Sequence, residues 1–242
     1  MRYIEKHFDT VAVQQYKQEL NSLQLDERSL SDAQVHPGNT GGQLYDKVRD
    51  MATFRALKVQ MYHEQGGVCC YCGMKLEQPF DPQYRVEHVL PKESHRELVG
   101  EYKNLLLSCR ASKEELELRK NIASKAVRKG FIHCDEAKGS KEITYSPLDK
   151  SCEGAFWYDL RGAVHSNNPE AQRDIKTLGL DGAYLMSRRK EAIDSLFIDE
   201  VLLSEDYLRA YRDGLRTPGA DGKLAEFYFV LIDAINQLLP NN

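Results

Sequence analysis

The sequence lacks any apolar run approaching the roughly 18 residues that a membrane span requires, and it contains no internal repeat or low-complexity tract. Its first ten residues, MRYIEKHFDT, lack the apolar core of a signal peptide. We therefore expect a cytoplasmic protein that does not enter a membrane.

The sequence also lacks an excess of positive charge, with 33 Lys and Arg against 37 Asp and Glu and a net charge of -4. Binding of nucleic acid normally depends on Lys and Arg that neutralise phosphates. Any nucleic-acid surface must therefore be local, or shared with a partner. Hydrophobic residues make up 41% and charged residues 29% of the 242 residues, which excludes a mostly disordered chain and predicts one compact core with helical extensions.

Six cysteines are unusual for a chain expected in a reducing compartment, where clustered thiols bind metals more often than they form disulfides. Cys69 and Cys72 form a C-x-x-C pair, a spacing that suits tetrahedral zinc. Cys109 and Cys134 are the separated cysteines available as the other two ligands. Four thiolates saturate zinc, so this metal would be structural.

Two alternatives for the cysteines remain open at this point. Cys70 could replace Cys69, although a C-x-C chelate is a tighter and rarer geometry, and we interpret Cys70 and Cys152 as core thiols. All six cysteines could instead be buried and unligated.

Hydrophobic periodicity divides the chain into three regions: an N-terminal arm and helix (1–66), a region of short strands and candidate site residues (67–150), and a hairpin followed by helices (151–242). The fold class we expect is mainly α, an α+β protein with a small zinc-stapled centre. In the first region we predict a loop over Ser29–Gly42 and one helix over Leu44–Met61 that ends at Gly66-Gly67. In the second region we predict strands over Arg85–Leu90 and Asn104–Ser108 and one charged helix over Ser112–Lys129. In the third region we predict a hairpin of Phe156–Leu160 with Ala163–His165, and then helices that begin after an Asn168 cap and are interrupted at Thr217–Gly219.

Three short segments carry residues that suit metal-dependent chemistry. Glu87-His88 lies within the first predicted strand, Asn104 begins the second, and His133-Cys134-Asp135 is followed by Lys138-Gly139. Taken singly, each has an ordinary structural explanation, as a hydrogen-bonded strand histidine, a turn cap or a helix N-cap. Their order along the chain, bracketed by four cysteines at zinc spacing, favours a common site.

In these segments the chain resembles the HNH endonuclease superfamily, and more narrowly the PtuB-type HNH subunit of Septu and retron-associated anti-phage systems. The resemblance implies a ββα-metal centre in which Glu87 and Asp135 bind a catalytic Mg²⁺ or Mn²⁺. It makes His88 the general base and Asn104 the residue that orients the histidine and ties the loop. His133 is an alternative ligand or a second polar contact to phosphate.

The resemblance also implies a role and partners. The chain would be the toxic effector that hydrolyses phosphodiester bonds of DNA, or of an RNA such as tRNA. It would act in a hetero-oligomer with a PtuA-like ATPase subunit and a reverse transcriptase with its retron DNA and RNA. Two departures from the general pattern stand out: a long segment separates Cys109 from Cys134, and the third HNH position is an aspartate.

A basic segment follows the second predicted strand, with eight basic and three acidic residues between Lys103 and Lys129. We predict that it binds phosphate beside the site through Lys113, Lys120, Lys125, Arg128 and Lys129. A solvated helix with paired charges is the alternative. Between Lys190 and Asn242 ten acidic residues face five basic ones, so we expect this part to avoid phosphate.

Two functions from other classes compete with the nuclease. A non-catalytic zinc-ribbon protein that binds nucleic acid would need the cysteines and the basic helix, but not Glu87, His88 and Asp135. A scaffold subunit would need none of these catalytic groups. Cleavage that depends on a divalent ion separates both from an enzyme.

Overall fold

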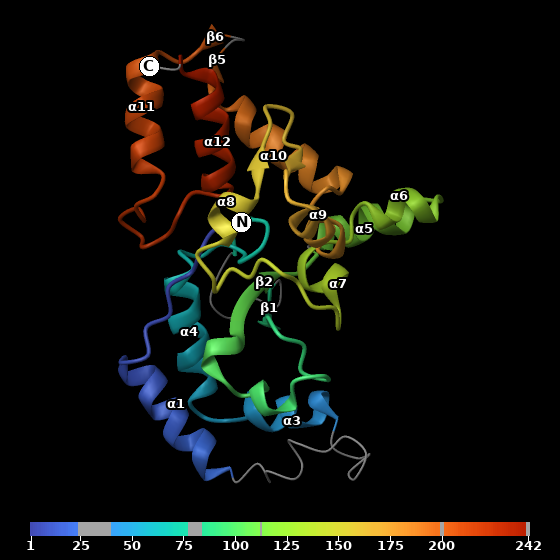
Figure 1. Cartoon of the computed structure of the whole chain (residues 1–242), viewed down its shortest axis with the longest axis vertical. Coiled ribbons are helices and arrows are strands. Elements are labelled where there is room, and N and C mark those ends of the chain that lie inside the picture. Colours follow the sequence, from blue (N-terminus) through green and yellow to red (C-terminus); the bar gives the residue numbers. More distant parts are fainter. Residues whose placement is uncertain (24–39, 77–83, 112, 199–200, 241–242) are drawn as a thin grey trace.

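The computed structural model describes residues 1–23, 40–76, 84–111, 113–198 and 201–240. It is a mixed α+β structure in which helices predominate, as the sequence predicts, and its described residues form three two-stranded antiparallel sheets (Figure 1). Most of the loop predicted over Ser29–Gly42 lies outside the described residues.

Three helices form the N-terminal end of the molecule: α1 (Val11–Ser22), α3 (Gly41–Arg49) and α4 (Phe54–Glu64). The prediction of a single helix over Leu44–Met61 is wrong, because the chain turns between α3 and α4. The carboxylate of Glu19 on α1 accepts hydrogen bonds from the backbone N–H groups of Ala52 and Thr53, both at 2.9 Å. These bonds satisfy donors that a new helix start leaves open.

The middle of the molecule is the sheet of β1 (Tyr84–His88) and β2 (Leu105–Cys109), which are joined through two short 3₁₀ turns, Arg96–Leu98 and Tyr102–Asn104. The two strands run antiparallel, with His88 opposite Leu105. Every residue of β2 is buried, and a short helix, α7 (Cys134–Lys138), contacts this strand. Two strands and one helix thus meet at a single place (Figure 1).

An arm of two helices, α5 (Lys113–Asn121) and α6 (Lys125–Lys129), leaves the sheet after β2 and projects from the side of the molecule (Figure 1). The prediction of one continuous helix over Ser112–Lys129 is wrong. The helix α5 ends at Asn121. Ser124 then caps the start of α6, since its hydroxyl accepts a hydrogen bond from Val127 N.

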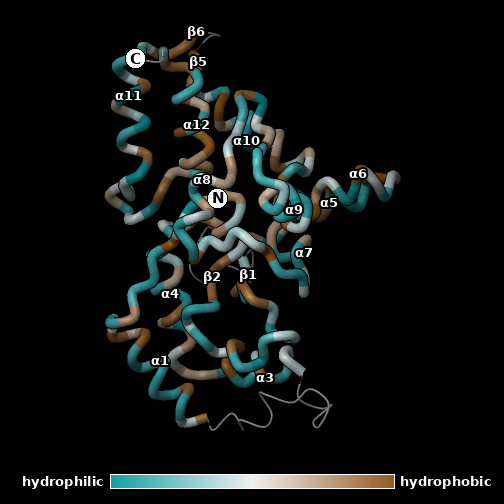
Figure 2. The backbone as a smooth tube through the Cα atoms, in the orientation of Figure 1, coloured by the Kyte–Doolittle hydropathy of each residue, from teal (hydrophilic) through white to brown (hydrophobic). Residues whose placement is uncertain are grey.

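The remaining elements form the C-terminal end, and they are α8 (Cys152–Ala155), β3 (Trp157–Tyr158), β4 (Val164–His165), α9 (Pro169–Thr177), α10 (Ala183–Asp194), β5 (Phe197–Ile198), β6 (Val201–Leu202), α11 (Glu205–Gly214) and α12 (Tyr228–Leu238). The predicted hairpin and the Asn168 cap are confirmed. The β5–β6 pair is not among the elements predicted above. Figure 2 shows hydrophobic residues concentrated along α12 and β2. None of the described helices is long and apolar enough to cross a membrane.

Candidate metal centre and catalytic pocket

Four buried thiols meet where three segments converge. These are the turn at residues 69–73 after α4, here called the knuckle, the end of β2 and the start of α7. The Sγ atoms of Cys69, Cys72, Cys109 and Cys134 all lie within 4.8 Å of one another. The Sγ atoms of Cys69 and Cys134 are 3.8 Å apart, and those of Cys72 and Cys109 are 3.6 Å apart. Tetrahedral zinc with Zn–S bonds of about 2.3 Å needs sulfur atoms about 3.8 Å apart, so these four thiols could hold a structural metal such as zinc.

The backbone around the thiols takes conformations that direct them to one point. Gly66 and Gly67 end α4 with φ angles of 59° and 68°, and Gly73 closes the knuckle with φ 80°. Cys134 has φ 56° although it is not a glycine, a conformation that costs energy and persists where surrounding contacts enforce it. Its N–H donates to the carbonyl of Leu178 at 2.7 Å, which fixes this ligand position from the C-terminal half.

His133 lies on the thiol side of α7. Its Nδ1 is 3.4 Å from the Sγ of Cys134 and 3.6 Å from that of Cys109, and its ring stacks on Tyr184 with centroids 5.8 Å apart. The ring is buried and does not line the pocket that contains Asp135. The geometry therefore associates His133 with the cysteine cluster, and not with the phosphate contact considered from the sequence.

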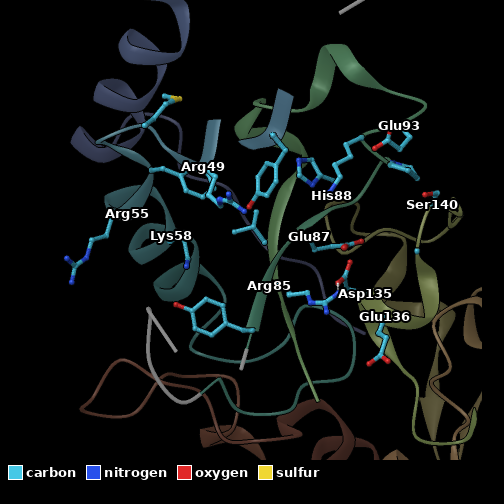
Figure 3. A pocket seen from close by; sticks show the side chains of 18 residues that line it. Arg49, Arg55, Lys58, Arg85, Glu87, His88, Glu93, Asp135, Glu136 and Ser140 are labelled. Carbon is cyan, nitrogen blue, oxygen red and sulfur yellow. Dashed lines mark hydrogen bonds and ion pairs between the residues drawn. The ribbon is translucent and has the colours of Figure 1, made fainter. Parts of the chain in front are cut away.

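A pocket of about 730 Å³ opens on the other side of β1 and α7. Glu87, His88 and Asp135 all line it, and Figure 3 shows Glu87 and Asp135 pointing toward one another. Burial, followed by a hydrogen bond to Asp135, raises the pKa of Glu87 to about 8, although the Lys138 ammonium opposes this shift. Burial and the neighbouring Asp135 carboxyl group thus both favour the neutral form of Glu87.

His88 is held in one tautomer by a backbone carbonyl. Its Nε2 lies 2.9 Å from the carbonyl oxygen of Val99, which can only accept a hydrogen bond. Nε2 therefore carries the proton, and Nδ1 keeps the lone pair that a base requires. Burial lowers the pKa of His88 to about 4, against the opposing hydrogen bond to Val99, so the ring is neutral at pH 7. Tyr45 packs edge-on against it, with centroids 4.8 Å apart.

Asn104 ties together the loop between the two strands. Its Oδ1 accepts a hydrogen bond from Leu90 N at 2.8 Å, and its Nδ2 donates to the carbonyls of Leu90 at 3.0 Å and Leu98 at 3.4 Å. None of these hydrogen bonds reaches His88. The side chain acts on the histidine indirectly, because it fixes the loop whose Val99 carbonyl binds the ring.

Two residues that sequence reasoning did not place in the site complete it. Lys138 is buried on α7, and its Nζ lies 2.9 Å from Glu87 Oε1 and donates to the carbonyl of His88 at 3.0 Å. Tyr71, inside the C-x-x-C knuckle, donates its hydroxyl to Glu87 Oε1 at 2.8 Å. Lys138 follows Asp135 by three residues, so the helical period could have placed both on one face. Tyr71 carries no such signal.

The five cations predicted to bind nucleic acid lie on the arm and not around this pocket. Lys113, Lys120 and Arg128 line a separate hollow of about 540 Å³, and Lys129 lines another of about 500 Å³. Lys120 pairs with Glu117 at 2.6 Å. Their role in binding stays a prediction, but they do not surround His88.

The donor set of the pocket suits a hard divalent cation. Glu87 and Asp135 offer carboxylate oxygens, the ligands that Mg²⁺ and Mn²⁺ prefer. Within the described part of the chain, the four cysteines are the one group of three or more His, Cys, Asp or Glu side chains close enough to share an ion. A cation on Glu87 and Asp135 would therefore complete its shell with water and substrate oxygens.

A comparison with models of known protein families and with curated proteins finds no match for this chain. The assignment of a site thus rests on the geometry above and on the sequence pattern.

We predict that Cys134→Ser removes a ligand of the structural metal. Zinc content should fall and cooperative thermal unfolding should be lost, since binding free energy at such a site is largely folding free energy. Cys152→Ser is the matched control, because Cys152 is buried but lies outside the cluster. Elemental analysis and calorimetry measure both effects. A Cys134→Ser protein with a full zinc complement and normal folding would contradict the assignment.

Proposed function

We propose that the chain is an HNH-type endonuclease that hydrolyses phosphodiester bonds in nucleic acid with the help of a divalent cation. The observation that carries this proposal is the placement of a neutral histidine beside two converging carboxyl groups in one pocket. The antiparallel β1–β2 pair with α7 against it supports a ββα-metal centre, and the order of Glu87, Asn104 and Asp135 supports the HNH family.

In this proposal His88 accepts a proton from water through Nδ1, because Val99 keeps Nε2 protonated. Glu87 and Asp135 would hold the cation, which offsets charge on the phosphate and on the leaving oxygen. Lys138 and Tyr71 orient the Glu87 carboxylate, and Asn104 fixes the loop behind His88. The thiol cluster takes no part in the chemistry and holds β2 and α7 in register.

His88→Ala should lower cleavage by roughly 100-fold or more, the scale on which a lost general base is felt. Zinc content and thermal stability should stay near those of the parent. His63→Ala is the control, since His63 is exposed on α4 and does not line the pocket. The assay uses labelled DNA and tRNA with Mg²⁺ or Mn²⁺ under single-turnover conditions at low salt. Parent-like cleavage by His88→Ala would refute the role of the base.

We further propose that the nuclease is the toxic effector of an anti-phage complex with an ATPase subunit, a role suggested by the sequence resemblance. We expect two surfaces to contact the partner. One is formed by the acidic C-terminal helices, and the other by the arm at the N-terminus, in region 1–66, which is distinct from the arm of α5 and α6. Purified alone, the chain should then cut poorly at physiological salt, and coexpression with the ATPase should raise specific cleavage. Strong, specific cleavage by the isolated chain would contradict this dependence.

A further inference from the structure

We infer that Arg49, Arg55 and Lys58, here called the cationic wall, bind the phosphodiester backbone next to the bond that is cut. This inference rests on the proposed nuclease function and extends it, because it names the surface that receives the strand. No sequence motif marks these three residues, which belong to α3 and α4.

The cationic wall lines the same pocket as Glu87, His88 and Asp135. Figure 3 shows the three cations on one side of the pocket, whereas Glu93, Glu136 and Ser140 lie on the opposite side. Charge is therefore unevenly distributed across the site. A nucleic-acid strand whose phosphate reaches Glu87 and Asp135 gains more favourable contacts where it continues toward α3 and α4 than on the opposite side.

The balance of charge in the pocket favours an anionic ligand. Its lining holds five Lys and Arg, namely Arg49, Arg55, Lys58, Arg85 and Lys92, against four carboxyl groups, Glu87, Glu93, Asp135 and Glu136. Arg85 pairs with Asp135 at 3.1 Å and stands between the wall and the carboxyl pair. A divalent cation on Glu87 and Asp135 would make the pocket still more positive. The overall charge of -4 therefore does not prevent local binding of phosphate.

Within the wall, Arg55 and Lys58 come from the same helix. They lie three residues apart on α4, so they share one face of the helix. The Nζ of Lys58 sits 5.1 Å from the centre of the Tyr84 ring, which supports the side chain at the pocket edge. Arg49 is partly neutralised by Asp46 at 3.1 Å and Asp50 at 3.8 Å.

The chemistry of the wall points to the backbone of nucleic acid and not to its bases. Among the described residues, the pocket lining contains no Asn or Gln, the side chains that read adenine through paired hydrogen bonds. Tyr45 already packs against His88 and Phe54, and Tyr84 is buried, so neither ring offers a free face for stacking. Binding through phosphates predicts weak dependence on sequence and strong dependence on salt.

The test measures the affinity of labelled 20-nucleotide DNA and RNA, single-stranded and duplex, at several salt concentrations. All variants carry His88→Ala so that the probe is not cut. Arg55→Glu with Lys58→Glu reverses the wall. Arg173→Glu with Lys176→Glu is the matched control, because it makes the same charge change at the same spacing on the exposed face of α9. Arg55→Lys with Lys58→Arg keeps the charge. Zinc content and melting temperature establish that each variant is folded.

We expect the reversed wall to weaken binding at least tenfold and to flatten the salt slope by about 1.4 to 1.8, the loss of two phosphate contacts. The charge-conserving pair should bind like its parent, and the α9 variant should stay within twofold. Unchanged binding by the reversed wall, or an equal loss in the α9 variant, would overturn this inference while leaving the nuclease assignment intact. A parent chain that neither binds nor cuts any probe would overturn both.

Discussion

The meeting of four thiols is the constraint on which the rest of the structure depends. Cys69 and Cys72 come from the knuckle after α4, Cys109 ends β2, and Cys134 begins α7. A metal bound to them would tie three distant parts of the chain to one point, with a binding free energy on the order of 10 kcal/mol. The arm of α5 and α6 lies between the third and fourth ligands, so it forms a loop closed by the cluster. The inserted arm therefore leaves the knuckle, β2 and α7 in place, because the cluster joins these three segments directly.

The candidate catalytic groups are built directly on this support. Tyr71 lies inside the knuckle and binds Glu87, whereas Asp135 follows the ligand Cys134 and its N–H donates to Ser108, the neighbour of the ligand Cys109, at 3.3 Å. The carboxyl group of Glu87 and the backbone of Asp135 are thus each held by a residue adjacent to a cysteine ligand. Lys138 pairs with Glu87 from α7, and its charge limits the cost of burying a carboxylate. The thiol cluster and the pocket thus form one structural unit, in which the cluster supports the elements and the pocket holds the candidate catalytic groups.

The sequence predicted the parts of this unit that rest on local patterns. Cysteine spacing identified the four thiols that the structure brings together, and the predicted strands pair in antiparallel register, with bounds shifted by one or two residues. The segments Leu44–Met61 and Ser112–Lys129 were each predicted as one helix, but each forms two helices. In Leu44–Met61 the hydrophobic period continues across the turn between them. The break before α4 depends on Glu19, a distant residue whose contact no local pattern encodes.

Contacts between distant segments also explain what the sequence missed in the site. The carbonyl of Val99 fixes the tautomer of His88, but a backbone carbonyl has no signature in a sequence. Arg55 and Lys58 look like ordinary surface residues of an amphipathic helix until α4 is packed against the sheet. The basic arm, in contrast, is obvious in the sequence, but none of its described residues lines the pocket.

We propose that the chain binds a structural metal and a catalytic metal at two separate sites. Anomalous diffraction from crystals soaked in Mn²⁺, recorded on both sides of the zinc and manganese absorption edges, distinguishes the two metals. We predict a zinc peak among Cys69, Cys72, Cys109 and Cys134, and a manganese peak between Glu87 and Asp135. Zinc bound to the carboxylates, an empty thiol cluster in folded protein, or no manganese beside Glu87 would contradict this separation.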